Sequence, residues 1–104
     1  MLMNVISEKV LRNFWSIYPD AETPLLEWVK TFRSTDFSDF HHIRIVYPHA
    51  DYKVPLTIFN IGGNKYRLLV DINYEGKRVL VRAILTHEEY DKINLNTPKV
   101  RENL

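Results

Sequence analysis

Apolar side chains recur every three or four residues in two segments near the start of the chain, which is the spacing of helices with one buried face. The first segment follows Ser7, a good N-cap residue, and ends at Pro19. The second opens with Thr23 and Pro24, which suit the N-cap and the first helical position. The apolar positions of the two segments are Val10, Leu11, Phe14, Trp15 and Tyr18, then Leu25, Leu26, Trp28, Val29 and Phe32. We therefore predict an antiparallel pair of helices, preceded by a short strand over residues 3–6.

The middle of the chain has a weaker pattern. Residues 34–42 are rich in Ser, Thr and Asp, and they have room for one short helical turn. Residues 43–47 predict a short strand ended by Pro48, and residues 49–55 predict a polar loop.

After this loop, apolar and polar side chains alternate, which is the period of a strand with one buried face. The alternating segments are residues 56–60, 65–74 and 77–85, separated by turns at Gly62-Gly63 and Glu75-Gly76. Thr86 then suits the N-cap of a short helix over residues 87–93. These elements predict an α+β domain in which two N-terminal helices pack on one face of a small, mostly antiparallel sheet, followed by a short C-terminal helix. At 104 residues we expect one domain spanning residues 1–104, with a loosely held polar tail over residues 94–104.

A two-residue turn at residues 75–76 sets the pairing of the last two strands. The opposed pairs are then Tyr74–Lys77, Ile72–Val79, Val70–Val81, Leu68–Ala83 and Tyr66–Leu85. This register buries one apolar face and places Arg67 opposite Ile84, with Arg82 on its diagonal about 7–8 Å away. Two guanidinium groups at that separation suit one phosphate, because each offers a planar fork of donors.

Three further side chains flank the same end of this exposed sheet face, namely Lys65, His87 and Tyr90. We therefore expect a phosphate-binding site there. A solvated face without function is the alternative, in which Arg82 pairs with Asp71, His87 caps its helix and Tyr90 anchors that helix to the sheet.

The amino-acid composition excludes several kinds of site. The chain has no Cys, which excludes disulfides, thiolate zinc sites, iron–sulfur clusters and a cysteine nucleophile. The adjacent His41 and His42 lack a third ligand at suitable spacing, so we expect no metal and no other cofactor. The formal net charge is +1, so any phosphate-binding surface is local. No apolar run approaches the roughly 20 residues of a membrane span, and the start does not resemble a signal peptide, so we expect no membrane contact and a cytoplasmic location.

The segments FNIGGNKYRLLVDINY (residues 59–74) and VRAILTHEEYDK (residues 81–92) closely resemble the HigB toxins of bacterial type II toxin–antitoxin systems, which belong to the RelE-like group of small ribonucleases. The segments at residues 4–30 and 43–51 are similar to the same family. The resemblance implies a RelE-like fold and an mRNA interferase, a ribonuclease that cuts messenger RNA, commonly on a translating ribosome. It further implies inhibition by a cognate helix-turn-helix antitoxin. The family's recurrent polar positions correspond to Asn60, Asn64, Lys65, Arg67, Arg82, His87, Tyr90 and Asp91.

RNA cleavage without a metal uses the 2′-hydroxyl to attack the adjacent phosphate, so it needs a base, cations for the crowded phosphorane and an acid for the leaving 5′-oxygen. We assign Arg67 and Arg82 to the charge that grows on phosphorus. His87 is the first choice for acid or base, because histidine titrates near pH 6.5, and Lys65 is the alternative base. Tyr90 stacks on a base or donates a proton. We expect three further residues to bind RNA, namely Asn60, Asn64 and Arg78.

Two other functions remain as alternatives. A non-catalytic RNA-binding module and a protein-interaction domain would each use the same basic sheet face. The net charge of +1 also departs from the strongly basic character usual for nucleases that grip ribosomal RNA.

Overall fold

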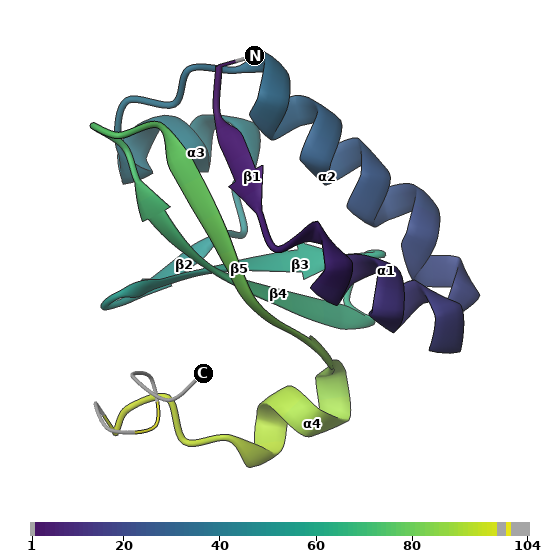
Figure 1. Ribbon diagram of the computed structural model, residues 1–104. Coiled ribbons are helices and arrows are strands. Elements are labelled where there is room, and N and C mark those ends of the chain that lie inside the picture. The colour runs from purple at the N-terminus through teal and green to yellow at the C-terminus, as the bar shows by residue number, and fades with distance from the viewer. Residues whose placement is uncertain (1, 98–99, 101–104) are drawn as a thin grey trace.

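The computed structural model describes residues 2–97 and residue 100. In this part of the chain, five strands form one sheet in the order β1-β5-β4-β3-β2 (Figure 1). The strands are β1 (Asn4–Ile6), β2 (Asp51–Lys53), β3 (Leu56–Ile61), β4 (Tyr66–Asn73) and β5 (Arg78–Thr86). β1 pairs with β5 in parallel, whereas the pairs β2–β3, β3–β4 and β4–β5 are antiparallel. The prediction of a mostly antiparallel sheet in an α+β fold is confirmed.

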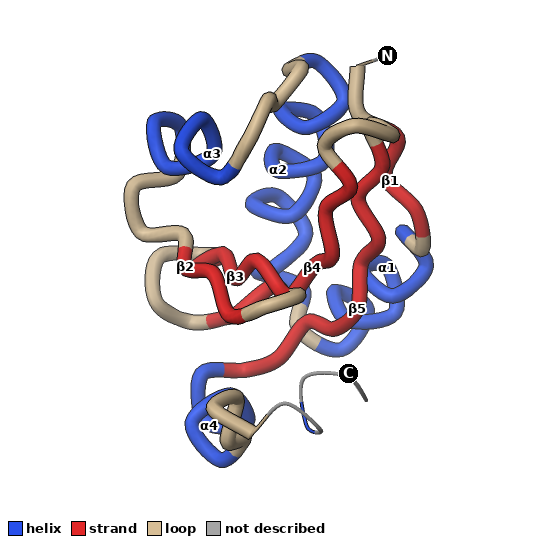
Figure 2. Tube along the Cα trace, turned by 90° about the vertical axis from the view of Figure 1, so that its left-hand side faces the viewer, coloured by secondary structure: helices blue, strands red, loops and turns tan. Residues whose placement is uncertain are grey.

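The helices lie on both sides of this sheet. They are α1 (Glu8–Ile17), a 3-10 turn η1 (Pro19–Ala21), α2 (Glu22–Ser34), α3 (Phe40–Val46) and α4 (His87–Lys92). Figure 2 shows the strands running across the molecule from β2 to β1, with α4 well apart from α1 and α2. The predicted N-terminal helix pair and the short C-terminal helix are thus both present.

The main core lies between the sheet and the helices α1, α2 and α3. Trp28 and Phe32 of α2 are fully buried, and their ring centroids lie 4.5 Å apart. Phe59 of β3 meets the Phe32 ring edge-on at 5.5 Å, and Phe37 lies 4.6 Å from Phe32 on the other side. Such aromatic contacts stabilise the core beyond their burial alone. They fix α2 across the inner face of the sheet.

A second apolar cluster covers the opposite face. It consists of Leu56, Ile58, Leu69 and Leu95, with Ala83, Leu85, Tyr90, Ile93 and Val100 packed against it. The prediction that this face is exposed is therefore wrong for the half under α4. Leu95 is only 4% exposed, so residues 94–97 are attached to the sheet, while residues 98–99 and 101–104 of the predicted loose tail lie outside the described residues.

The segment around residue 43 is a helix, not the predicted strand. Asp39 caps α3, because its carboxylate accepts a hydrogen bond from the backbone N–H of His42 at 2.8 Å. Helical spacing turns Phe40, Ile43 and Tyr47 toward the core and leaves Ile45 68% exposed. A strand would bury Ile45 beside Ile43, so the β-branched residues misled the prediction.

Other element boundaries also differ from prediction. The predicted loop at residues 49–55 contains β2. α2 begins at Glu22 after η1, so Thr23 and Pro24 lie within its first turn instead of starting it. Ser7 precedes α1 as predicted, but its φ of 72° is left-handed and its side chain makes no capping bond.

The β4–β5 pairing is correct near the turn and wrong beyond it. Ile72 lies opposite Val79 and Val70 opposite Val81, as predicted. A β-bulge then places Arg82 as the extra residue, so Leu69 faces Ala83 and Arg67 faces Leu85 instead of Ile84. The shift turns Ile84 into the main core, where it is 7% exposed. Simple alternation would have left this large apolar side chain on the outer face.

The second cluster generates a stability prediction. Leu95→Ala is expected to lower the free energy of unfolding by about 2–3 kcal/mol, because it leaves a cavity between the C-terminal segment and the sheet. Urea denaturation followed by circular dichroism measures this loss. Ile45→Ala, at an exposed position of α3, is the control and is expected to change stability by no more than about 0.5 kcal/mol. Equal effects of the two substitutions would contradict the assignment of Leu95 to a core.

Candidate functional site

Arg67 is the most buried charged side chain among the described residues, with 8% of its surface exposed. Its Nη2 donates to Asn64 Oδ1 at 2.7 Å, and its Nη1 donates to the backbone carbonyls of Asn64 and Tyr66, each at 3.2 Å. The guanidinium carbon also lies 5.6 Å from the centre of the Tyr90 ring, within range of a cation–π interaction. These contacts hold the side chain in one orientation on the outer face of β4.

The turn at Gly62-Gly63 places Asn64 next to Arg67. Gly62 and Gly63 adopt φ values of 63° and 70°, which side chains with a Cβ atom rarely adopt. The chain therefore reverses sharply between β3 and β4 and places the Asn64 amide beside the guanidinium. Asn60, the last polar residue of β3, lies opposite Arg67 in the ladder.

The start of α4 is fastened to the same end of the sheet. Thr86 accepts a hydrogen bond from the Glu89 backbone N–H at 3.2 Å, and the Glu89 carboxylate accepts one from the Thr86 N–H at 2.9 Å. This reciprocal arrangement is a capping box. The His87 N–H donates to the Lys65 carbonyl at 2.8 Å. α4 thus begins at a fixed point, and Tyr90, one turn later, lies over Arg67.

His87 pairs with a carboxylate on its own helix. Its Nε2 lies 3.2 Å from Asp91 Oδ2, one helical turn away. Its Nδ1 is covered and has no hydrogen-bond partner among the described residues, although the side chain as a whole is 43% exposed. The Asp91 carboxylate favours a proton on Nε2 and orients the ring.

Tyr90 is a phenol that keeps its proton. Burial raises its pKa, and the negative charges of Asp51 and Asp91 raise it further, against a smaller opposing effect of Arg67. A raised pKa keeps the phenol protonated at neutral pH, so the hydroxyl can donate a hydrogen bond there and does not act as a base. The predicted anchoring role is also real, because the Tyr90 ring packs in the second apolar cluster.

Lys65 points away from Arg67, toward the helix side of the sheet. Its Nζ donates to Asp20 Oδ2 at 2.8 Å, and the Tyr66 hydroxyl donates to the other oxygen of the same carboxylate. The hydrogen bonds from Lys65 and Tyr66 lower the pKa of Asp20, and the bond to Asp20 raises the pKa of Tyr66 to about 12. Lys65 is therefore engaged by the Asp20 carboxylate, which argues against its use as the base.

The predicted convergence of Arg67 and Arg82 on one point is not present in the structure. Arg82 pairs with Asp71, with Nη1 and Oδ2 3.7 Å apart, which is the alternative that the sequence also allowed. Asp71 lies four residues along β4 from Arg67, which corresponds to roughly 13 Å. Both arginines lie on the outer face of the sheet, but Arg82 is held beside Asp71. Arg78 lies beyond Arg82 at the hairpin end of β5, opposite Asn73.

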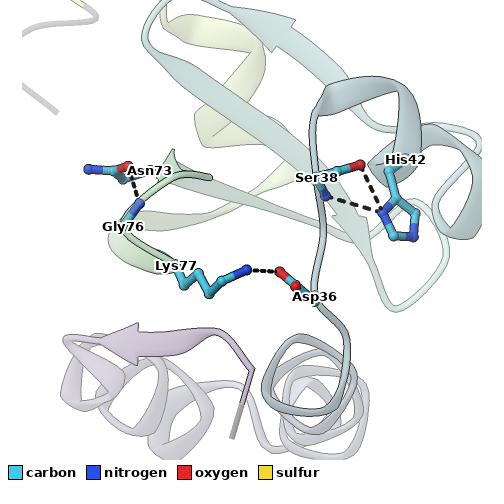
Figure 3. A network of polar contacts seen from close by, with 6 residues as sticks. All are labelled: Asp36, Ser38, His42, Asn73, Gly76 and Lys77. Atoms are coloured by element: carbon cyan, nitrogen blue, oxygen red, sulfur yellow. Dashed lines mark hydrogen bonds and ion pairs between the residues drawn. The ribbon is translucent and has the colours of Figure 1, made fainter.

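The hairpin end of the sheet holds a separate polar network (Figure 3). Asn73 accepts a hydrogen bond from the Gly76 N–H at 2.7 Å, and Lys77 forms an ion pair with Asp36. His42 lies near Ser38, whose backbone N–H is 3.2 Å from Nδ1. Within residues 2–97 and at residue 100, no three His, Asp or Glu side chains gather as metal ligands. In the same residues, no helix has the length and apolar character needed to cross a membrane.

The structure therefore divides the predicted site. Arg67 contacts Asn64 and Tyr90 at one end of the sheet, and the His87–Asp91 pair lies on the same short helix as Tyr90. Arg82 and Arg78 lie along the outer face toward the hairpin. Asp20 was missed, because nothing in the sequence connects it to Lys65, 45 residues later. A proline that ends a helix beside an acidic residue is too common a pattern to indicate a site.

Comparison with known proteins identifies the family of this chain. Residues 21–93 match the HigB toxin family, described as the RelE-like toxic component of a toxin-antitoxin system. The mRNA interferase HigB of Escherichia coli O6:H1 (strain CFT073) is 32% identical and covers 97% of this chain and 98% of its own length. The mRNA interferase toxin HigB of Escherichia coli K12 is 29% identical over 86% of this chain and 88% of its own. The chain therefore belongs to the HigB family of RelE-like toxins.

Proposed function

We propose that this protein is an endoribonuclease that cleaves messenger RNA as the toxin of a type II toxin–antitoxin system. The observation that carries the proposal is the orientation of the Arg67 guanidinium beside Tyr90 and the His87–Asp91 pair in a chain of the HigB family. Relatives that span nearly the whole chain are named mRNA interferases. We further propose that it acts in the cytoplasm on RNA held by a translating ribosome, and that a cognate helix-turn-helix antitoxin inhibits it.

The residues fit cleavage through the 2′-hydroxyl. In this reaction the 2′-oxygen forms a bond to phosphorus while the bond from phosphorus to the 5′-oxygen breaks, leaving a cyclic phosphate and a 5′-hydroxyl. Arg67 stabilises the negative charge that grows on the phosphoryl oxygens, because its donors are already oriented. The His87–Asp91 pair takes the proton of the attacking hydroxyl through the exposed Asp91 carboxylate, because the unprotonated ring nitrogen of His87 is covered. Tyr90 donates a proton to the leaving oxygen.

The other predicted residues take supporting roles in this proposal. Asn64 positions Arg67, and Asn60 contacts the RNA beside it. Arg82 and Arg78 bind phosphates further along the strand of RNA, on the uncovered part of the outer face. Lys65, tied to Asp20, contributes positive charge near His87 and does not act as the base.

A non-catalytic RNA-binding role would use the same face without the proton transfers. Incubating the protein with a reporter messenger RNA, with and without ribosomes, separates the two possibilities. We expect cleavage when ribosomes translate the message. Binding without cleavage under both conditions would leave only the non-catalytic role.

Arg67→Ala is expected to lower the rate of messenger RNA cleavage by about 10²–10³-fold, corresponding to about 2.7–4 kcal/mol, because it removes an oriented donor to the phosphorane. Cleavage in a translating extract, followed by gel electrophoresis, measures the change. Arg12→Ala is the matched control, since it removes the same charge at an exposed position of α1. If Arg67→Ala cleaves at the normal rate while remaining folded, Arg67 has no catalytic role.

Tyr90 provides a test that separates proton donation from anchoring. Tyr90→Phe keeps the ring over Arg67 and removes only the phenol, so we expect slower cleavage by about 10²-fold with a nearly normal melting temperature. Tyr90→Ala is expected to lower both the cleavage rate and the melting temperature. Normal cleavage by the Phe variant would show that the ring acts only as an anchor.

Asp71 competes with RNA for Arg82 in this proposal. Asp71→Asn is expected to raise RNA affinity severalfold, because it frees the guanidinium from its ion pair. Fluorescence anisotropy with a labelled oligonucleotide measures the affinity. The gain should disappear in the Arg82→Ala background, which separates release of Arg82 from a general loss of negative charge. A gain of equal size without Arg82 would contradict this role.

A further inference from the structure

The edge of the sheet at β2 has no further strand beside it in the described part of the chain. β2 is the last strand in the order β1-β5-β4-β3-β2, so it pairs with β3 along one side only (Figure 2). An edge strand presents backbone N–H and C=O groups that another strand can bind. The side chains of β2 therefore decide whether this edge repels or accepts a second strand.

The backbone of Tyr52, the central residue of β2, faces the open side. Tyr52 lies opposite Thr57 of β3, and its N–H donates to the Asp51 carboxylate at 2.8 Å, a side-chain oxygen outside the β2–β3 ladder. In an antiparallel ladder the N–H and C=O of one residue point to the same side of the strand, so the Tyr52 carbonyl also lies on the open side. Tyr52 thus offers a donor and an acceptor to a neighbouring strand.

The side chains of β2 alternate between the two faces of the sheet. Asp51 and Lys53 share the outer face with α4, where the charge of Asp51 contributes to the raised pKa of Tyr90. Tyr52 lies on the opposite face, and its ring centroid is 5.5 Å from that of Phe40 in α3. The Tyr52 side chain remains 48% exposed. Within residues 2–97 and residue 100, the ion pairs of the structure involve neither Asp51 nor Lys53.

The sequence of β2 is complementary to itself in an antiparallel arrangement. When two copies pair about a twofold axis at Tyr52, Asp51 of each copy lies opposite Lys53 of the other. The two Tyr52 residues lie opposite each other and exchange two backbone hydrogen bonds. Opposite charges and aromatic side chains that face each other across a ladder both stabilise the pairing. The strand at the other edge of the sheet, β1, carries no charged side chain that could set a register in this way.

We propose that β2 is a self-association surface, through which two copies of this chain form a symmetric dimer with one continuous sheet. On pairing, the Tyr52 N–H passes from the Asp51 carboxylate to the Tyr52 carbonyl of the second copy, and the carboxylate turns to Lys53 of that copy. The N–H keeps one acceptor throughout, so the gain comes from the newly bound carbonyl groups and the two ion pairs. Association also brings a positive charge to the outer face, on the side that carries α4.

Sedimentation velocity over a range of protein concentrations tests the proposal. Because β2 is only three residues long, we expect a weak dimer, with a Kd between about 1 µM and 1 mM. Asp51→Lys and Lys53→Asp each place like charges opposite one another at both pairs. Each variant is therefore expected to raise the Kd at least about tenfold. A natural protein that stays monomeric up to about 1 mM would overturn the inference.

An equal mixture of the Asp51→Lys and Lys53→Asp variants gives the sharper test, because opposite charges then face each other again at both pairs. The mixture is expected to form a heterodimer with a Kd within about threefold of the natural value, although neither variant dimerises well alone. A mixture that stays as monomeric as its components, or single variants that dimerise as the natural protein does, would contradict the proposed register.

Glu75→Lys is the matched control, because it makes the same change of charge as Asp51→Lys at an exposed position in the turn between β4 and β5. It is expected to keep the natural Kd. Equal weakening by Glu75→Lys would show that net charge, and not the pairing of β2, governs association. Circular dichroism of each variant confirms that the exposed substitutions leave the fold unchanged, so a lost dimer reports on the β2 surface.

Discussion

A guanidinium group that leaves water must keep its N–H donors occupied, and this requirement at Arg67 explains much of the surrounding structure. The side chain is 8% exposed, yet the hydrogen bonds that it makes within the described part of the chain go to no carboxylate. Carbonyl oxygens and the Asn64 amide take its hydrogen bonds, and the Tyr90 ring faces its carbon. The positive charge is thus held in place without being cancelled. The N–H donors that these bonds leave over are held in one orientation for a phosphate that approaches this point.

This arrangement depends on two local structures on either side of β4 and β5. The Gly62-Gly63 turn brings Asn64 to the guanidinium, and the Thr86–Glu89 capping box starts α4 at the position that carries Tyr90 over it. The second apolar cluster then keeps α4 against the sheet. The same apolar cluster therefore buries Leu95 of the C-terminal segment and holds Tyr90 in place beside Arg67.

The sequence was sufficient to predict the fold class and the helix pair, because each rests on a period or a turn that local chemistry determines. Alternation could not predict the β-bulge at Arg82. The deciding factor is whether Ile84 is buried, and this depends on a core assembled from α1, α2 and the sheet together. Arg82 is the extra residue of this bulge, and its guanidinium pairs with Asp71. The prediction of a strand over residues 43–47 was wrong for a related reason. The helix cap at Asp39 and the burial of Ile43 outweigh the strand preference of β-branched side chains.

The small net charge also has a structural explanation with consequences for binding. Several basic side chains already have acidic partners, namely Lys65 with Asp20, Lys77 with Asp36, Arg33 with Glu8 and Arg82 with Asp71. A phosphate that binds one of these cations must displace or share a carboxylate, so the exchange of one anion for another contributes little net free energy. At physiological salt the remaining field fades within about 8 Å. Affinity for RNA must therefore come from short-range contacts at points such as Arg67, where the cation is oriented but not paired. A chain with this charge distribution discriminates among RNA positions by geometry, and long-range attraction has only a small part.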